Sequence, residues 1–500
     1  MPRSVDIVII GSGFAGLGMA IRLRQEGRDD FIILERAADL GGTWRDNSYP
    51  GCACDIPSYL YSYSFAQNPR WTRMFSPQRE IWDYLRDCSK RYGLGPHLEY
   101  GAEVTSATWD EAAGRWLLEV MGSRPISCRV LVSGIGALHV PKIPEIAGLG
   151  SFSGTTFHSA TWRHDLDLTG QRVAVVGTGA SGVQVVPAIA DRVKHLDVYQ
   201  RTPAWILPRP DRAIRAAEHE RFRRHPAALR LARNRVYWSL EARGVGFTVS
   251  ARLQPVAERM ARRYLERKVQ DADLRARLTP TYEFGCKRAL LSSDFYPAVQ
   301  KPNVALVTSG IGCFTPRGIV DTSGVERPVD TVVLATGFDV SANVKHMDIV
   351  GRDGVVLNET WAHGVNAHLG IMVSGFPNLF LLLGPNTGLG HSSVVFMIES
   401  QISFVLSALR LLDGVGARAV DVRPEAQEQS VQAVQDDLVG TVWQSGCRSW
   451  YLDDTGRNIS IWPRSTVRYW LRTRRLRRRD YRLDPGRSQP NRQIREGARA

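Results

Sequence analysis

Two glycine-rich turns constrain the fold of this 500-residue chain more than any other feature. The first follows the β-branched run at 5–10 and reads Gly-Ser-Gly-Phe-Ala-Gly, and the second follows residues 172–176 and reads Gly-Thr-Gly-Ala-Ser-Gly. A strand, a tight turn and a helix in this order are typical of dinucleotide sites, because glycine lets the backbone approach the pyrophosphate and the helix N-terminus offers free N–H groups. The two turns predict binding contacts from Gly11, Gly13, Gly16, Gly177, Thr178, Gly179, Ala180, Ser181 and Gly182.

The residue that ends the second strand differs between the two units. Glu35 stands 24 residues after Gly11, and Arg201 stands 24 residues after Gly177. A carboxylate accepts hydrogen bonds from ribose hydroxyls and repels a 2′-phosphate, whereas arginine attracts that phosphate. We therefore predict FAD at the first site and NADPH at the second, where Thr202 accompanies Arg201. The alternative is that Arg201 is an ordinary solvated arginine.

Composition excludes several other classes of protein. A hydrophobic fraction of 43% argues against disorder, and the length allows two or three domains. The net charge is +14, but residues 470–500 carry eleven arginines and only three acidic residues, so the excess is concentrated in the tail. We interpret this tail as solubilising rather than as a contact with an anionic surface, and we expect no nucleic-acid partner.

The seven cysteines are scattered, and none has histidine partners at metal-ligand spacing. We expect no metal site, and we expect reduced thiols and a cytoplasmic location. The N-terminus lacks the pattern of a signal peptide, and no uninterrupted apolar run reaches about 18 residues. A soluble protein without a membrane anchor is predicted, whereas its oligomeric state is left open.

The order of these features predicts an α/β chain with two discontinuous Rossmann-like domains and a helical insertion. We assign 1–140 and 385–500 to the FAD-binding domain, 141–210 and 281–384 to the NADPH-binding domain, and 211–280 to the insertion. The insertion is rich in Arg, Ala, Leu and Glu at helical spacing. Its charges are interpreted as a solvated helix face.

Two further motifs resemble one enzyme family. Residues 152–162 match FxGxxxHxxxW, the fingerprint of the Baeyer–Villiger monooxygenases, and 41–55 match that family's second signature, which ends at an aspartate. The Cys-Lys-Arg segment at 286–288 and the strand at 333–338 are also similar to family segments. The resemblance extends from about residue 5 to residue 470. One departure is Arg163, which stands where the family usually has Pro or Asp.

The resemblance implies a site built from residues far apart in the chain. Arg288 is the implied catalytic cation, and Asp55 is its partner. Arginine suits this role because it keeps its proton when buried. From the residues alone, Asp55 could instead cap a turn, and Trp44, Tyr61 and Trp450 could be ordinary core aromatics. The further implied cofactor contacts are Gly42, Thr43, Trp44, Tyr61, Lys287, Val394 and Trp450, and His158 is implied to couple the domains rather than to move protons.

The implied reaction inserts one oxygen atom of O2 beside a ketone carbonyl through a flavin C4a-peroxide, giving an ester or lactone. A fixed cation lowers the cost of the anionic charge that this chemistry requires. The alternative is a heteroatom-oxidising or N-hydroxylating flavin monooxygenase, which shares the cofactors. A redox-linked binding protein without oxygenation is a rival from another class. The sequence does not identify the ketone.

Overall fold

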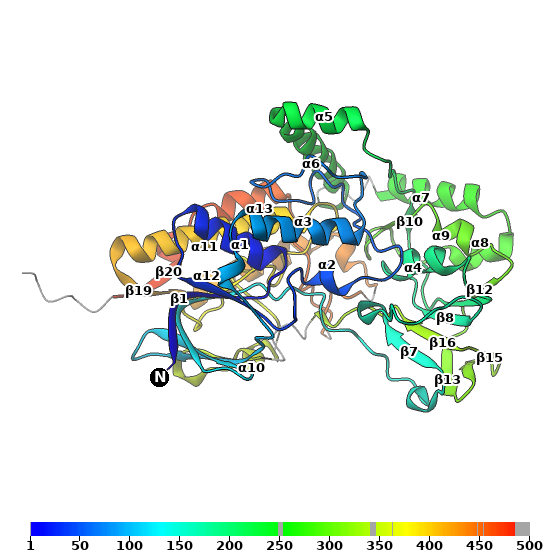
Figure 1. Cartoon of the computed structure of the whole chain (residues 1–500), viewed down its shortest axis with the longest axis horizontal. Coiled ribbons are helices and arrows are strands. Elements are labelled where there is room, and N and C mark those ends of the chain that lie inside the picture. The colour runs from blue at the N-terminus through cyan, green and yellow to red at the C-terminus, as the bar shows by residue number, and fades with distance from the viewer. Residues whose placement is uncertain are drawn as a thin grey trace, which may run out of the picture.

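The protein forms two lobes, each organised around its own sheet, with a pair of helices above the junction (Figure 1). The computed structural model describes residues 2–248, 254–340, 347–362, 364–447, 449–453 and 455–485. The predicted α/β class is confirmed, and both glycine-rich turns lie between a strand and a helix.

The first lobe contains an eight-stranded sheet whose central strands are almost fully buried. β1 pairs in parallel with β2 and β6, whereas β4, β5 and β6 form an antiparallel meander. The strands are, in spatial order, β17 (Asp348–Val350), β4 (Val104–Asp110), β5 (Arg115–Val120), β6 (Ile126–Ser133), β1 (Arg3–Ile10), β2 (Phe31–Glu35) and β3 (Leu98–Tyr100), with β18 (Leu379–Leu381) also paired with β6.

Two of these strands join the sheet of the first lobe, although the sequence assigns them to the second domain. β17 and β18 lie within 281–384, the range that the sequence assigns to the second domain, yet they pair with β4 and β6 of the first sheet. Each strand is only three residues long, so its local pattern carries little information about the sheet that it joins. The partner is determined by long-range burial, and Ile349, Leu379 and Phe380 are fully buried.

The second lobe contains a five-stranded parallel sheet. Its cover includes α4 (Gly182–Ile189) and α9 (Phe295–Ala298). A small antiparallel sheet of β13 (Ile311–Thr315), β14 (Gly318–Asp321) and β15 (Glu326–Pro328) adjoins it. The five strands are, in order, β12 (Val304–Val307), β9 (His195–Tyr199), β8 (Arg172–Val176), β16 (Thr331–Leu334) and β7 (Thr155–His158).

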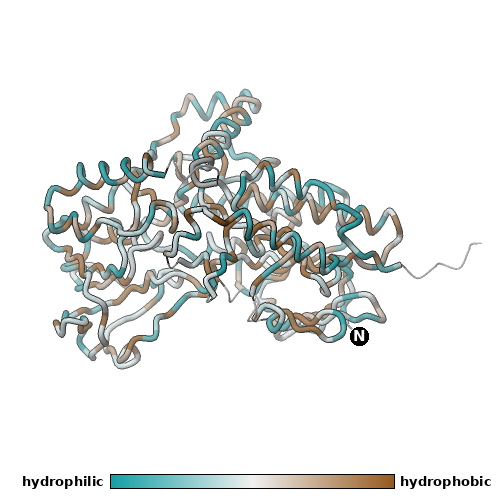
Figure 2. The backbone as a smooth tube through the Cα atoms, turned by 180° about the vertical axis from the view of Figure 1, so that it is seen from behind, coloured by the Kyte–Doolittle hydropathy of each residue, from teal (hydrophilic) through white to brown (hydrophobic). Residues whose placement is uncertain are grey.

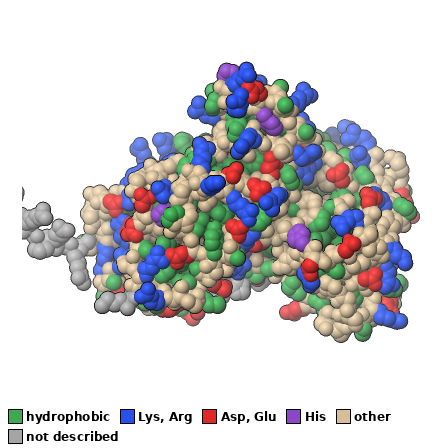
Figure 3. All heavy atoms as spheres, viewed as in Figure 1, with side chains coloured by type: hydrophobic (Ala, Val, Ile, Leu, Met, Phe, Trp, Pro, Cys, Tyr) green, Lys and Arg blue, Asp and Glu red, His purple; other side chains and the backbone are tan. Residues whose placement is uncertain are grey.

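The helical region splits between the two lobes. α5 (Ala216–Arg224) and α6 (Pro226–Thr248) pack on the first lobe through Phe222, Leu229 and Leu240. α7 (Gln254–Lys268) and α8 (Ala272–Leu278) pack on the second lobe. Space-filling atoms show Lys and Arg gathered on the protruding α5 region, where Glu220 pairs with Arg223 and Arg224 (Figure 3). The exposed face of α5 therefore fits the expected solvated helix face.

Three helices share the core of the first sheet: α1 (Phe14–Gln25), α3 (Gln78–Arg91) and α11 (Val394–Val415). α12 (Pro424–Leu438) packs with the C-terminal segment through Val434 and Leu438. α11 is the one described helix that is long and apolar enough to cross a membrane by length and composition. Most of it is instead buried against α1, α13 (Thr466–Thr473) and β19 (Ala417–Val422). Apolar stretches lie toward the interior of each lobe, whereas outer helices such as α7 are largely hydrophilic (Figure 2). The remaining short elements are α2 (Thr43–Asp46), α10 (Leu357–Ala362), β10 (Ile206–Leu207), β11 (Leu290–Leu291) and β20 (Tyr481–Pro485).

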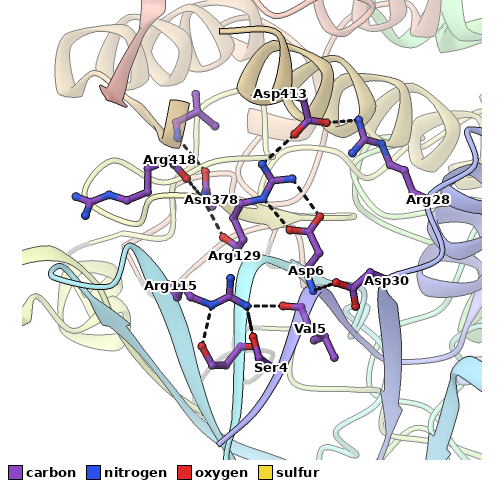
Figure 4. Close-up of polar contacts among 12 residues, drawn as sticks. Ser4, Val5, Asp6, Arg28, Asp30, Arg115, Arg129, Asn378, Asp413 and Arg418 are labelled. Carbon is purple, nitrogen blue, oxygen red and sulfur yellow. Dashed lines mark hydrogen bonds and ion pairs between the residues drawn. The ribbon is translucent and has the colours of Figure 1, made fainter. Parts of the chain in front are cut away.

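An ion-pair network connects the first sheet to the end of α11 (Figure 4). Arg129 on β6 binds Asp6 on β1 and Asp413 on α11, and Asp413 also binds Arg28. Asn378, just before β18, donates to the carbonyls of Arg129 on β6 and Arg418 on β19. This side chain therefore connects the start of β18 to both strands. These contacts fix α11 relative to β1. The first glycine-rich turn follows the end of β1, and Val394 begins α11, so both elements carry predicted site residues.

Candidate active site at the junction of the lobes

The first glycine-rich turn leaves an open backbone position between two tight ones. A Cβ on Gly11, whose φ is +91°, would lie 2.8 Å from the Gly134 carbonyl oxygen, and one on Gly16 would lie 1.8 Å from the Gly11 oxygen. At Gly13 the nearest atom, Cα of Gly42, is 3.9 Å away. Gly11 and Gly16 therefore pack tightly against the backbone, whereas the backbone at Gly13 is open. This arrangement leaves room for a pyrophosphate beside the N-terminus of α1.

Glu35 lies at the end of β2 inside a complete set of partners. Its carboxylate accepts hydrogen bonds from Ser12 N at 3.0 Å, Ser12 Oγ at 2.7 Å and Ala37 N at 3.0 Å, and Arg45 Nη1 lies 3.0 Å away. Burial alone would raise the pKa of Glu35, but these hydrogen bonds and the charge of Arg45 lower it. The residue is thus held as a carboxylate, as a ribose-binding acid requires.

The second turn repeats the arrangement. A Cβ on Gly177, whose φ is +112°, would lie 2.5 Å from the Ala335 oxygen, and one on Gly182 would lie 2.1 Å from the Gly177 oxygen. Gly179 has no atom within 4 Å of that position. Ala180 and Ser181 complete the turn before α4, and Thr178 Oγ1 lies 3.5 Å from the Thr202 carbonyl. This turn can also accept a pyrophosphate.

Two cations lie together beside the second turn. Arg201 is exposed just after β9, and Lys287 lies 4.8 Å from the centre of the Tyr282 ring. Burial and the nearby charge of Arg201 lower the pKa of Lys287. An anion placed between these side chains would relieve their repulsion, so the pair fits a 2′-phosphate.

The structure brings Arg288 and Asp55 together across 233 residues of sequence. Arg288 Nε and Nη2 lie 2.8 and 2.7 Å from Asp55 Oδ2, and Nη1 donates to the Leu389 carbonyl at 3.2 Å. The Asp55 carboxylate raises the pKa of Arg288 further above its usual value. The side chains are 27% and 29% exposed, so the pair is accessible to a small molecule. The possibility that Asp55 only caps a turn is thereby excluded.

The Asp55 segment also contacts the second lobe. Tyr49 donates to Gln184 Oε1 on α4 at 3.1 Å, and Gln184 Nε2 donates to the Ala53 carbonyl at 3.0 Å. A Cβ on Gly51 would lie 2.6 Å from the Gln184 carbonyl oxygen. Gln184 is a positioning residue that sequence reasoning missed, since a glutamine within a helix carries no motif of its own.

The predicted aromatic contacts cluster near the first turn. Trp44 on α2 donates from Nε1 to Tyr61 Oη at 3.1 Å, and Tyr61 packs edge-on against Phe14. Gly42, with φ +51°, and Thr43 begin α2 opposite Gly13. Both rings also pack against the buried core, so the core interpretation and the cofactor interpretation are compatible.

The C-terminal segment closes the site around Arg288. Val394 begins α11, and Ser393 caps that helix through Val395 N. Tyr451 is buried and lies near Arg288, and its pKa is raised to about 12 by burial. Trp450 packs edge-on against Tyr451 but is 46% exposed, so it is not a core tryptophan.

The fingerprint residues lie at the crossing between the lobes. β7 carries His158 beside Leu334 of β16, and the His158 ring packs edge-on against Phe338. Burial lowers the pKa of His158. Phe338 and Pro141 form an isolated antiparallel β-bridge, so the segment before β7 and the segment after β16 lie side by side. The position of His158 fits a coupling role, whereas Arg163 forms an exposed ion pair with Asp165.

Two expectations need correction. Cys286 and Cys447 are bonded as a disulfide, so the expectation of reduced thiols is wrong for this pair, which lies far apart in sequence and is joined only by folding. The charges of the insertion are not all solvated, because Arg233 and Glu241 on α6 are buried. Within the described residues, no group of three or more His, Cys, Asp or Glu side chains could hold a metal ion.

Comparison with known proteins identifies the relatives of this chain. A profile for NAD(P)-binding Rossmann-like domains matches residues 9–77, and one for L-lysine 6-monooxygenase/L-ornithine 5-monooxygenase matches 58–219. Two proteins called Baeyer-Villiger monooxygenase are similar over 96% of this chain and 92% of their own. The one from Pseudomonas aeruginosa is 46% identical, and the one from Streptomyces coelicolor is 47% identical.

Solved structures give the same result. Cyclohexanone monooxygenase from Rhodococcus sp. Phi1 bound to NADP+ has a TM-score of 0.87 at 26% identity, covering 97% of this chain and all of that one. An oxidized steroid monooxygenase bound to NADP has a TM-score of 0.86 at 29% identity, with the same coverage.

Fold and site together define a flavoprotein monooxygenase with two dinucleotide sites. The relatives make the assignment narrower: the chain belongs to the Baeyer–Villiger monooxygenase family. It uses FAD and NADPH to insert an oxygen atom of O2 beside a ketone carbonyl, and the comparisons do not support the N-hydroxylating alternative.

Proposed function

We propose that Arg288 is the catalytic cation of this enzyme and that Asp55 orients it. The observation that carries this proposal is the two-point contact between the two side chains beside the Leu389 carbonyl. Bound FAD and NADPH supply the oxygen transfer and the hydride. Arg288 has five N–H donors, and its contacts with Asp55 and Leu389 use three, so two are available to oxygen atoms of the reacting groups.

The charge of Arg288 is suited to an anionic reaction. Asp55 holds the guanidinium protonated and fixes its plane, so its donors are oriented before the substrate arrives. Asp55 also balances part of the positive charge in a partly buried site, where an unpaired charge would be costly. The pair therefore stabilises developing negative charge on oxygen without donating its proton.

We further propose which residues hold the cofactors. FAD is assigned to the first unit, at Gly11, Gly13, Gly16, Glu35, Gly42, Thr43, Trp44, Tyr61 and Val394, with Asp55 close to it. NADPH is assigned to the second unit, at residues 177–182 with Arg201, Thr202, Lys287 and Trp450. The open positions at Gly13 and Gly179 and the Arg201–Lys287 pair support this division. We therefore assign 1–140 with 385–500 to FAD and 141–210 with most of 281–384 to NADPH. The strands at 348–350 and 379–381 go with the FAD domain, whose sheet they join, and 211–280 forms the helical insertion.

Replacement of Arg288 tests the catalytic role. Arg288→Ala is expected to lower ketone oxidation by about 10²- to 10³-fold, because a preorganised donor to a developing oxyanion is lost. Flavin reduction by NADPH is expected to continue. Product analysis by gas chromatography and stopped-flow flavin absorbance measure the two steps separately. Arg223→Ala, at an exposed ion pair on α5, is the matched control. Ester formation by Arg288→Ala at the rate of the unmodified enzyme would contradict the assignment.

A cytoplasmic location is proposed for this enzyme. Five cysteines remain free, four of them buried, which is the usual state in a reducing compartment. Cys286–Cys447 is the exception. Fractionation of the native cells, combined with mass spectrometry of alkylated peptides, measures both the location and the state of this pair. Recovery in the culture medium would contradict the proposal.

A further inference from the structure

One face of α6 is buried against the segments that surround Arg288. Arg233, Tyr237, Glu241 and Gly244 follow one another at steps of four, four and three residues, which places them along one side of the helix. Arg233 and Glu241 are 6% and 7% exposed. Burying charged side chains requires partners, so this face must be built for specific contacts.

The first half of the face contacts the segment that carries Tyr61. Arg233 Nη1 donates to the carbonyls of Tyr59, Leu60 and Ser62 at 3.1, 3.1 and 2.8 Å. Its Nη2 lies 3.6 Å from Glu399 of α11. A single guanidinium thereby fixes the chain on both sides of Tyr61 relative to α11.

The second half of the face contacts the first turns of α11 and α13 and the loop before α11. Tyr237 stacks on Phe396 at 5.0 Å, and its hydroxyl lies 2.9 Å from Thr466 Oγ1. Glu241 accepts hydrogen bonds from Thr466 N and Oγ1 at 3.1 and 2.8 Å, and it lies 3.2 Å from His391 Nε2. These hydrogen bonds lower the pKa of Glu241 although burial alone would raise it.

Gly244 makes room for the His391 ring. A Cβ at Gly244 would lie 2.4 Å from His391 Cδ2 and 2.7 Å from Nε2, closer than real side chains approach. Glycine is disfavoured within a helix, so a glycine in this place has a packing reason. Glu241 and Gly244 together determine where the imidazole lies: the carboxylate binds it, and the glycine leaves space for it.

His391 lies in the loop that holds Arg288. Leu389, two residues earlier, accepts the Arg288 Nη1 hydrogen bond through its carbonyl, and Ser393, two residues later, caps α11. His391 is 2% exposed as a side chain, so it cannot move without moving the loop or α6.

We propose that the buried face of α6 positions loop 388–393, with His391 as the positioning residue, and so sets where the Arg288 guanidinium stands. The helical insertion then controls how efficiently NADPH consumption leads to product, through its contacts with this loop. This inference rests on the proposed role of Arg288. A small displacement of a catalytic group by a distant change can cost up to about 100-fold in rate.

Two variants of the face test the proposal. Glu241→Gln keeps the shape of the side chain but removes its charge, and Gly244→Ala pushes against the His391 ring. Both are expected to lower ester formed per bound flavin by about tenfold. Hydrogen peroxide released per NADPH is expected to rise, whereas KM for NADPH is expected to stay unchanged. Gly414→Ala is the matched control, because this helical glycine of α11 has no atom within 4 Å of a Cβ.

Hydrogen exchange provides a readout independent of turnover. In Glu241→Gln the amides of 388–393 are expected to exchange faster, while those of buried α11 stay protected. Unchanged exchange, or normal product per bound flavin in both variants, would overturn the proposal. If Gly244→Ala does not fold, the near-isosteric Glu241→Gln decides alone. If Arg288→Ala keeps ketone oxidation while Glu241→Gln uncouples the reaction, the role of Arg288 fails but the loop-positioning role of α6 does not.

Discussion

The two dinucleotide units share their turn geometry but differ in how their charged residue is held. Glu35 is 5% exposed and bound by Ser12, Ala37 and Arg45, so its charge is balanced by the protein itself. Arg201 is exposed and lies beside a second cation, Lys287. The charged residue of the first unit is therefore balanced by protein groups before any ligand binds. The second unit has an excess of positive charge that an anion would neutralise. This difference fits a cofactor that stays bound in the first unit and one that comes and goes in the second.

The largest effect, on both stability and FAD content, is expected from removing the Glu35 carboxylate of the first unit. Glu35→Ala leaves the buried Ser12 and part-buried Ala37 N–H groups without their acceptor, and each is expected to cost about 1–3 kcal/mol in the free energy of unfolding. Arg45 keeps Asp46 as its carboxylate partner. FAD content should fall as well. Thermal denaturation and flavin absorbance measure both. Arg201→Ala is the control, and equal destabilisation by the two variants would remove the distinction between the units.

The second unit is expected to lose ligand selectivity rather than stability. In the double variant Arg201→Ala/Lys287→Ala, each lost charged hydrogen bond to a 2′-phosphate is worth about 1.5–3 kcal/mol. KM for NADPH should rise by at least tenfold, while KM for NADH and the thermal midpoint change little. Steady-state kinetics with both nucleotides check this. A parallel rise in KM for NADH would argue against a 2′-phosphate contact.

The lowered pKa of Lys287 predicts a pH dependence for the second unit alone. Because burial and Arg201 disfavour the charged form, Lys287 loses its proton at a lower pH than an ordinary lysine. NADPH binding should therefore weaken as the pH rises through that pKa, and it should be fully present below it. KM for NADPH measured from neutral to alkaline pH tests this, with Lys287→Arg expected to flatten the profile because arginine keeps its charge.

The smallest effect is expected at the fingerprint departure. Arg163 pairs with Asp165 at an exposed position, and such ion pairs are worth at most about 1 kcal/mol. Arg163→Pro and Arg163→Asp, the residue types usual in the family, should leave KM for NADPH and product yield within about twofold of the unmodified enzyme. Steady-state kinetics test this. A larger change would mean that residue 163 does take part in coupling the two units.

Features governed by a few neighbouring residues were predictable from the sequence. The glycine turns are recognised from a spacing within six residues, and the acid or base at the strand end follows at a fixed distance in sequence, so FAD and NADPH could be assigned to separate units. Arg288 and Asp55 were found as well, but only through the family motifs. Spacing alone could not show that side chains 233 residues apart form a pair.

Tertiary structure decided the features whose partners are distant. β17 and β18 join the first sheet, Gln184 connects the Asp55 segment to α4, and Cys286 bonds to Cys447. Arg233 and Glu241 have the helical spacing of a solvated face, yet they are buried against the site. The physical reason is that local sterics determine a turn, whereas burial and charge pairing depend on which surfaces meet when the whole chain packs.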